Sequence, residues 1–242
     1  MARFFGGQWS ALKPERSVMT LMIVLTAITL VINVAGAAVA PLFGHLVLTP
    51  RRALGWEPWQ LVTNAFVEPD FIDLLLTFVM LIFFGNPIEQ RMGPRGFWKL
   101  FLGGVIGGSL LAAVVGRFVA PDAPLAGAQP ALTALLVGFG ALWAGQQVRA
   151  YGVAQMSATT MTWIFVGINV LVCLKAMRVD WRLGLVALCA VAGAALAGWL
   201  LTRRGGIDLG GSFDKMRMWR LKRRYKVLTG GRDTPPKKRW LN

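Results

Sequence analysis

Few side chains in this chain have the types and spacing that nucleophilic chemistry requires. Its single histidine, His45, would need Ser109 or Ser157 to reach it before a Ser-His pair could form. A Ser157-Lys175 dyad is no better, because eighteen residues of one helix would separate the two side chains by roughly 27 Å. These residues therefore do not predict a serine hydrolase.

Metal and cofactor chemistry also lacks the necessary residues. The two cysteines, Cys173 and Cys189, lie inside apolar runs without a supporting cluster of Cys or His. They are typical of small core residues. An intramembrane aspartyl protease needs two facing aspartates, and Asp73 has no evident mate. We expect no cofactor and no metal site.

The polar residues at the edges of apolar runs have both a structural and a functional interpretation. Burying a charge at mid-bilayer costs at least ~3 kcal/mol, so Asp73 is a candidate for client or proton binding. Asp70 follows Pro69 and precedes an apolar run, which is typical of an N-cap with Asp73 in the first turn. We favour capping. Gln129 before Pro130 likewise indicates a helix start.

The elements that position these residues are predicted to be transmembrane helices. The 242 residues are 55% hydrophobic and only 15% charged, and a helix needs ~20 apolar residues to cross ~30 Å of hydrocarbon. We expect an all-α membrane protein with six spans. The predicted spans, several of them short, are residues 18–40, 70–84, 98–120, 130–145, 158–175 and 181–201.

Residues 41–69 are expected to be an irregular loop in the polar interface, because they combine tryptophan, arginine and proline. Small residues recur four positions apart in the third and sixth spans, which lets helix backbones approach. We favour packing within the bundle over a dimerisation face. These small residues are Gly103, Gly104, Gly107, Gly108, Ala190, Ala194 and Gly198.

Basic residues predict the orientation and a lipid partner. The net charge is +15, and the last forty residues hold half of the 26 Lys and Arg. The positive-inside rule then places both ends in the cytoplasm. A basic block after a span favours anionic phospholipids over nucleic acid. The lipid-facing candidates are Lys215, Arg217, Arg220, Lys222, Arg223, Arg224 and Lys226, on an interfacial helix or a solvated tail.

The chain thus divides into a cytoplasmic segment 1–17, a six-helix membrane domain 18–202 and a basic cytoplasmic tail 203–242. Richness in Ala, Gly and Arg suggests the bacterial inner membrane.

The most informative stretch is residues 59–93, which ends in a Gly-x-x-x-Glu-x-x-x-Gly turn. It resembles the rhomboid superfamily, whose proteases share this frame without a gap. We expect Glu89 to pair with Arg91 or Arg95 at this turn. The frame residues are Trp59, Thr63, Phe66, Gly85, Ile88, Glu89 and Gly93.

The residues that the resemblance would assign to catalysis differ. Two histidines and an asparagine of the proteases' oxyanion site fall on Glu68, Asp73 and Thr77, and a carboxylate repels a developing oxyanion. The nucleophile position is Gln129. The base position in the sixth span is Val191. The resemblance therefore implies a pseudoprotease, not an enzyme.

Within the superfamily the chain is similar to the Golgi multipass rhomboid-like proteins and, more distantly, to derlins. These imply binding or scaffolding of membrane-protein clients through a degenerate cleft that includes Glu68, Asp73, Thr77, Gln129 and Val191. Two alternatives stay open: an active rhomboid-family intramembrane serine protease, and a small transporter or channel subunit. The client, the lipid specificity and the oligomeric state are left open.

Overall fold

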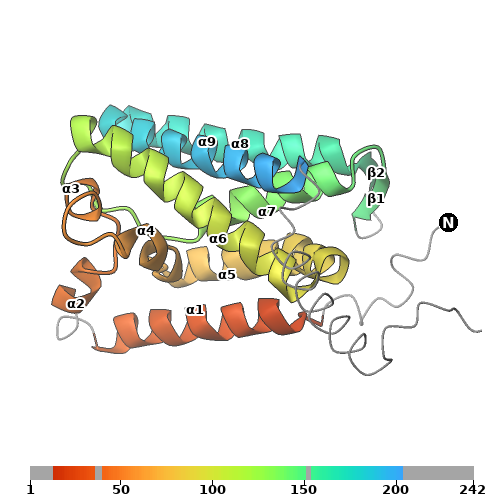
Figure 1. The fold of residues 1–242 in the computed structure, drawn as a ribbon, viewed down its shortest axis with the longest axis horizontal. Coiled ribbons are helices and arrows are strands. Elements are labelled where there is room, and N and C mark those ends of the chain that lie inside the picture. Colours follow the sequence, from red (N-terminus) through yellow and green to blue (C-terminus); the bar gives the residue numbers. More distant parts are fainter. Residues whose placement is uncertain (1–12, 36–39, 151–153, 204–242) are drawn as a thin grey trace, which may run out of the picture. The chain divides into compact units, whose positions relative to one another are not determined.

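A computed structural model describes residues 13–35, 40–150 and 154–203, and within them the chain is almost entirely helical. Its longer elements run back and forth along one direction (Figure 1). The helices are α1 (Arg16–Ala35), α2 (Ala40–Gly44), α3 (Pro50–Ala53), α4 (Gln60–Thr63), η2 (Asn64–Phe66), α5 (Phe71–Met80), η3 (Leu81–Gly85), α6 (Asn86–Val119), α7 (Gln129–Leu142), α8 (Ala158–Val179) and α9 (Trp181–Arg203).

Four helical stretches of the described residues are long and apolar enough to cross a membrane: Arg16–Ala35, Phe71–Val119, Ala158–Val179 and Trp181–Arg203. This bears out an all-α, multi-pass membrane protein. It does not reach six, for two reasons. Two predicted spans run together in Phe71–Val119, and α7, with 14 residues, is short for a crossing.

The join between those two predicted spans contains a sharp reversal. Gly93 inside α6 has φ 72° and ψ 173°, a conformation that L side chains rarely adopt, and Pro94 follows it. The chain therefore turns back at Gly93, so that the later part of α6 runs in the direction opposite to α5 (Figure 1). Between α5 and α6 the helix passes through a π-helical turn, η3.

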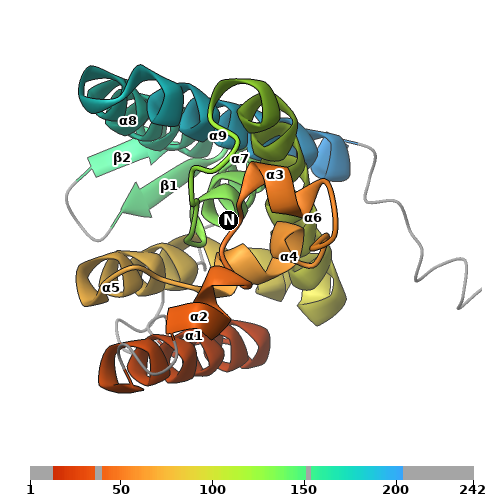
Figure 2. The ribbon, with the colours of Figure 1, turned by 90° about the vertical axis from the view of Figure 1, so that its left-hand side faces the viewer.

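Helices α6, α7 and α9 pack on one another, and α8 lies against α7 and α9 (Figure 2). Glycines make this possible. A Cβ on Gly107 would lie 2.7 Å from Ala197 Cβ, and one on Gly108 would lie 2.7 Å from the Ala190 carbonyl oxygen. The small residues of α6 and α9 thus serve packing within the bundle, as expected.

Two regions differ from the sequence prediction. The segment predicted to be an irregular loop contains the short helices α2, α3 and α4, because proline is tolerated in the first turn of a helix, where Pro41 of α2 and Pro50 of α3 lie. A β-hairpin, β1 (Gln147–Ala150) with antiparallel β2 (Ala154–Ser157), was not predicted. Its strands are four residues each, too short for a clear alternating pattern.

The start of α1 is held by Glu89, which lies 72 residues away in the chain. The buried Glu89 carboxylate accepts hydrogen bonds from Ser17 N at 3.0 Å, Ser17 Oγ at 2.7 Å and Val18 N at 3.1 Å. These are among the backbone donors that a helix start leaves unpaired, and the helix dipole favours an anion there. The predicted ion pair of Glu89 with Arg91 or Arg95 is wrong, since its oxygens face α1.

Neighbouring side chains extend this attachment. Asn86 Oδ1 accepts from Glu15 N at 2.9 Å, and Gln90 Nε2 donates to Glu15 Oε1 at 3.0 Å. Gly85 allows the close approach, because a Cβ there would lie 3.1 Å from both Val18 and Phe97. The turn from Gly85 to Gly93 thus binds the start of α1.

We predict that Glu89→Ala lowers the free energy of unfolding by about 2–4 kcal/mol, because buried donors at the start of α1 lose their acceptor. Gln90→Ala, which removes an exposed hydrogen bond of the same turn, should change it by less than about 0.5 kcal/mol. Thermal unfolding in detergent micelles measures both. Equal stabilities of the two variants would contradict this role of Glu89.

Candidate functional site

The loop before α5 and the start of α7 meet at Glu68. Its buried carboxyl accepts a hydrogen bond from Thr77 Oγ1 at 2.9 Å and one from Ala128 N at 3.3 Å. Gly127, at φ 112°, brings the backbone beside Glu68, where a Cβ would lie 3.4 Å from Oε2. One side chain therefore joins the loop before α5 to α5 itself and to the start of α7, which lies 60 residues further along the chain.

Burial raises the pKa of the Glu68 carboxyl above its ordinary value. The hydrogen bonds from Thr77 and Ala128 act in the opposite direction, and the nearby Asp73 and Asp70 add to the rise. The folded protein therefore binds a proton at Glu68 more readily than the unfolded chain does.

Next to Glu68 lies a cavity of about 390 Å³, here named the α5–α8 cavity. Its walls come from α5, the start of α7, α8 and α9, and most of its lining is apolar. Leu76 on α5 and Val172 on α8 are exposed and line its two sides, so the cavity is open between these helices. In size and lining it is typical of a site for an apolar ligand or side chains.

Three of the five predicted cleft residues line this cavity: Thr77 on α5, Gln129 at the start of α7 and Val191 on α9. Gln129 is exposed, whereas Thr77 and Val191 are buried. Glu68 lies beside Thr77 and is not among the lining residues. The structure thus brings together residues that the sequence separates by more than a hundred positions.

Asp73 lies apart from the cavity lining. Asp70 accepts hydrogen bonds from Ile72 N and Asp73 N, both at 2.9 Å, and caps α5. The predicted cap with Asp73 in the first turn is confirmed. The basic tail candidates Lys215 to Lys226, like the predicted interfacial helix, lie outside the described residues.

Sequence reasoning missed the polar floor of the cavity. Asn64 Nδ2 donates to Ser109 Oγ at 3.0 Å, and both residues line the cavity. Asn169 on α8 adds a third polar side chain. The position of Asn64 beside the frame residue Thr63 was the available signal. Its partner Ser109 could not be predicted, because it lies 45 residues away.

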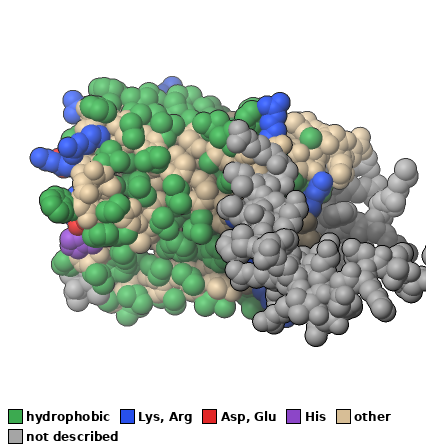
Figure 3. Space-filling model, viewed as in Figure 1, with side chains coloured by type: hydrophobic (Ala, Val, Ile, Leu, Met, Phe, Trp, Pro, Cys, Tyr) green, Lys and Arg blue, Asp and Glu red, His purple; other side chains and the backbone are tan. Residues whose placement is uncertain are grey.

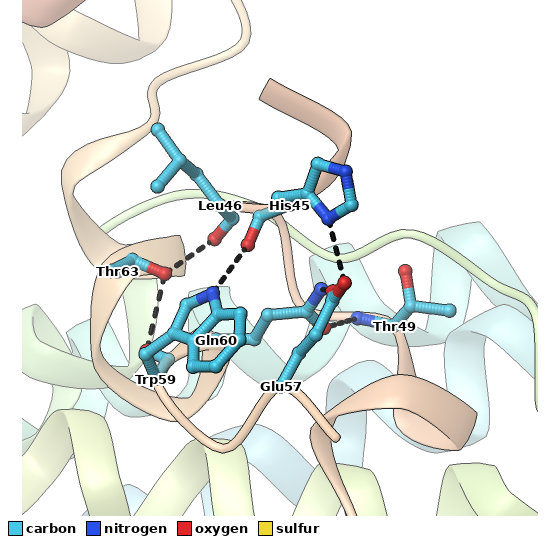
Figure 4. A network of polar contacts seen from close by, with 7 residues as sticks. All are labelled: His45, Leu46, Thr49, Glu57, Trp59, Gln60 and Thr63. Carbon is cyan, nitrogen blue, oxygen red and sulfur yellow. Dashed lines mark hydrogen bonds and ion pairs between the residues drawn. The ribbon is translucent and has the colours of Figure 1, made fainter. Parts of the chain in front are cut away.

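The only histidine lies in a different network, at the loop that carries the Trp-Thr frame (Figure 4). His45 Nδ1 is 2.6 Å from Glu57 Oε1, and Gln60 Nε2 donates to the other oxygen of Glu57. Gln60 Oε1 accepts from Thr49 N at 2.9 Å. Within the described part of the chain, no hydrogen bond joins His45 to a serine.

The frame residues Trp59 and Thr63 have structural partners in the same network. Trp59 Nε1 donates to the His45 carbonyl oxygen at 3.0 Å, and Thr63 Oγ1 donates to the Leu46 carbonyl oxygen at 2.8 Å (Figure 4). Phe66 packs on Phe101 of α6. Trp59 and Thr63 therefore hold the segment between α2 and α5 together, and Phe66 attaches it to α6.

Comparison with known proteins gives two matches. Residues 16–203 match the family described as eukaryotic integral membrane protein (DUF1751). A stretch of 64 residues is 33% identical to RHOMBOID-like protein 12, mitochondrial, of Arabidopsis thaliana, and covers 26% of this chain. The stretch spans 19% of that relative's length, so it is a partial likeness.

The family match corrects one expectation. A eukaryotic family contradicts the predicted bacterial inner membrane. Ala and Gly are abundant here because α6, α7 and α9 touch through small residues, so that their number reflects helix packing rather than the organism.

Because the folded pKa of Glu68 is raised, its contribution to stability is present below the unfolded pKa and is lost as pH rises through the folded pKa. Glu68→Gln keeps an acceptor for Thr77 and Ala128 and cannot ionise. We predict that it matches the wild type at acidic pH and is the more stable protein at alkaline pH.

Thermal unfolding in detergent across the pH range measures this difference. Glu68→Ala is the second variant, and it should lose about 1–3 kcal/mol at acidic pH, where the Thr77 and Ala128 donors are left without an acceptor. A Glu68→Gln protein less stable than the wild type at alkaline pH would overturn the argument.

Proposed function

We propose, from the premise that the chain belongs to the eukaryotic integral membrane protein family DUF1751, that it is a non-catalytic rhomboid-like protein that holds a client transmembrane helix. The α5–α8 cavity is the site of binding. The observation that carries the proposal is that this apolar cavity opens between two helices that face lipid and includes Thr77, Gln129 and Val191.

The chemistry of the lining supports a helix as the occupant. Most lining side chains are aliphatic or small, so they fit the side chains of another transmembrane segment. The polar floor of Asn64, Ser109 and Asn169 offers hydrogen bonds inside a low-dielectric site. A client helix with one polar residue at this depth would satisfy both features.

The positions that the resemblance assigns to catalysis support the non-catalytic part of the proposal. Gln129 carries no nucleophilic oxygen and Val191 carries no proton acceptor. Ser109, the serine of the cavity, is hydrogen-bonded to Asn64 instead of a base. We also propose six crossings, with α5 and the part of α6 after Gly93 as separate spans and α7 as a short span shielded by its neighbours.

We predict that a photoreactive amino acid at Val172 crosslinks a client, whereas one at Leu171 does not. The two positions are neighbours on α8 and are 62% and 64% exposed, but only Val172 lines the cavity. Filling the cavity by Ala187→Leu should remove the Val172 crosslink without lowering the unfolding temperature. Mass spectrometry of intact membranes identifies the adducts.

Equal crosslinking at Val172 and Leu171, or crosslinks at Val172 that persist in the Ala187→Leu protein, would contradict binding in the cavity. A client found at Leu171 alone would place the interface on the outer face of α8.

For the protease alternative, we predict that a fluorophosphonate probe does not label the purified protein in liposomes while it labels an active rhomboid protease. The reason is that Ser109 has no base, and Ser157 accepts from Thr160 N at 3.0 Å as the cap of α8. Labelling that disappears in Ser109→Ala or Ser157→Ala would refute the pseudoprotease.

A further inference from the structure

The short helix α3 is docked rigidly on the end of α6. Pro50 packs against Gly116, where a Cβ would lie 2.6 Å from Pro50 Cγ. Arg51 N donates to the Pro121 carbonyl oxygen at 2.9 Å. Leu48 and Leu125 exchange two backbone hydrogen bonds of 2.9 Å just before α3. The backbone of α3 is therefore fixed without help from the side chains of Arg51 and Arg52.

This docking places three arginines on one surface, here named the α3 arginine patch: Arg51, Arg52 and Arg117. Arg117, in the last turn of α6, donates to the Arg51 carbonyl oxygen at 3.5 Å. Arg51 Nη1 lies 3.9 Å from Asp122 Oδ1, with both side chains exposed. Over residues 13–35, 40–150 and 154–203, no carboxylate forms an ion pair with Arg52 or Arg117.

The patch therefore holds three positive charges against one weakly paired carboxylate. Arg117 reaches the backbone of Arg51, next to Arg52, so an anion bound at this surface would be attracted by all three positive charges. The planar, forked donors of the guanidinium groups match the oxygens of a phosphate group. Figure 3 shows Lys and Arg side chains at this end of the molecule, with hydrophobic side chains beside them.

Apolar side chains border the patch. Phe118 follows Arg117 and is 84% exposed, Trp56 is 93% exposed, and Leu54 is also exposed. Aromatic side chains beside arginine are typical of the boundary between head groups and acyl chains. A freely dissolved phosphate would leave these side chains in water, whereas a lipid would cover them with its acyl chains.

We propose that the α3 arginine patch binds the phosphate-bearing headgroup of an anionic phospholipid in the leaflet at the α3 end of the bundle. Arg51, Arg52 and Arg117 hold the phosphate oxygens, and Trp56 and Phe118 lie against the glycerol and the first part of the acyl chains. None of these residues lines the α5–α8 cavity, and the proposal does not depend on the proposed function.

The test uses the full chain in nanodiscs that contain a photoactivatable phosphatidylglycerol or the corresponding phosphatidylcholine. Crosslinks are mapped to peptides that contain residues 49–59 or 113–122. The wild type should give a clear excess with phosphatidylglycerol. Each Arg→Gln change should weaken binding by about fivefold, and the triple variant of Arg51, Arg52 and Arg117 should fall to the phosphatidylcholine level.

A matched variant, Lys222→Gln, Arg223→Gln and Arg224→Gln, removes three charges from the tail and should retain the crosslinks at these peptides. Unfolding temperatures in phosphatidylcholine alone check that both triple variants are folded. Equal crosslinking by the two lipids in the wild type, or an excess that survives in the patch variant, overturns the proposal. Equal stabilisation by dissolved glycerol phosphate and by phosphatidylglycerol would assign the patch to a free anion and also overturn it.

Discussion

The buried carboxylate of Glu89 at the start of α1 is the contact on which the arrangement of the bundle depends. A charge placed away from water is tolerated only where several donors surround it, and here α1 supplies three. Gly85 lets α1 come close, and Gly93 reverses the chain so that α6 can return through the bundle. The Gly-x-x-x-Glu-x-x-x-Gly pattern is thus one unit: it docks α1, presents the carboxylate and turns the chain. The rest of α1 is held on α5 and α6 by apolar side chains, among them the fully buried Leu21 and Leu25, so the carboxylate fixes the start of the helix and its register.

The α5–α8 cavity follows from the way in which the helices pack. Helices α6, α7 and α9 touch through glycine and alanine, so their backbones lie too close together to leave a space among them. Helix α8 has extensive contacts with only two helices, α7 and α9. Helix α5 contacts α1 and η3. The space between α5 and α8 is therefore the part of the bundle that its own side chains do not fill. Polar links at its inner edge, from Asn64 to Ser109 and from Glu68 to Ala128, keep that edge closed.

The sequence predicted well what is local and poorly what is distant. Apolar runs placed the helices to within a few residues, and the Asp70 cap followed from the residues beside it, because both depend on neighbours in the chain. The partners of Glu89 and Asn64 could not be predicted, since they lie 72 and 45 residues away and depend on the finished packing. The hairpin β1–β2 is too short for a pattern to show. Thr77, Gln129 and Val191 line one cavity, and they were grouped by the resemblance to rhomboid proteases and not by their spacing in the chain.

The carboxyl group of Glu68 bears on the proposal that the cavity binds a helix and does not cleave it. Acyl transfer needs hydrogen-bond donors that stabilise the oxyanion as it develops. These donors must have no other acceptor before the reaction. In this chain the Thr77 hydroxyl and the Ala128 N–H both donate hydrogen bonds to the Glu68 carboxyl group, beside the start of α7. A substrate carbonyl would have to displace a buried carboxyl group to use them, at the cost of leaving that group unpaired. The same two donors instead fix the start of α7 against α5, which sets the inner wall of the cavity. The polar residues at this position thus act on shape, and a cavity whose shape is fixed in advance would bind the proposed partner helix with less loss of conformational entropy.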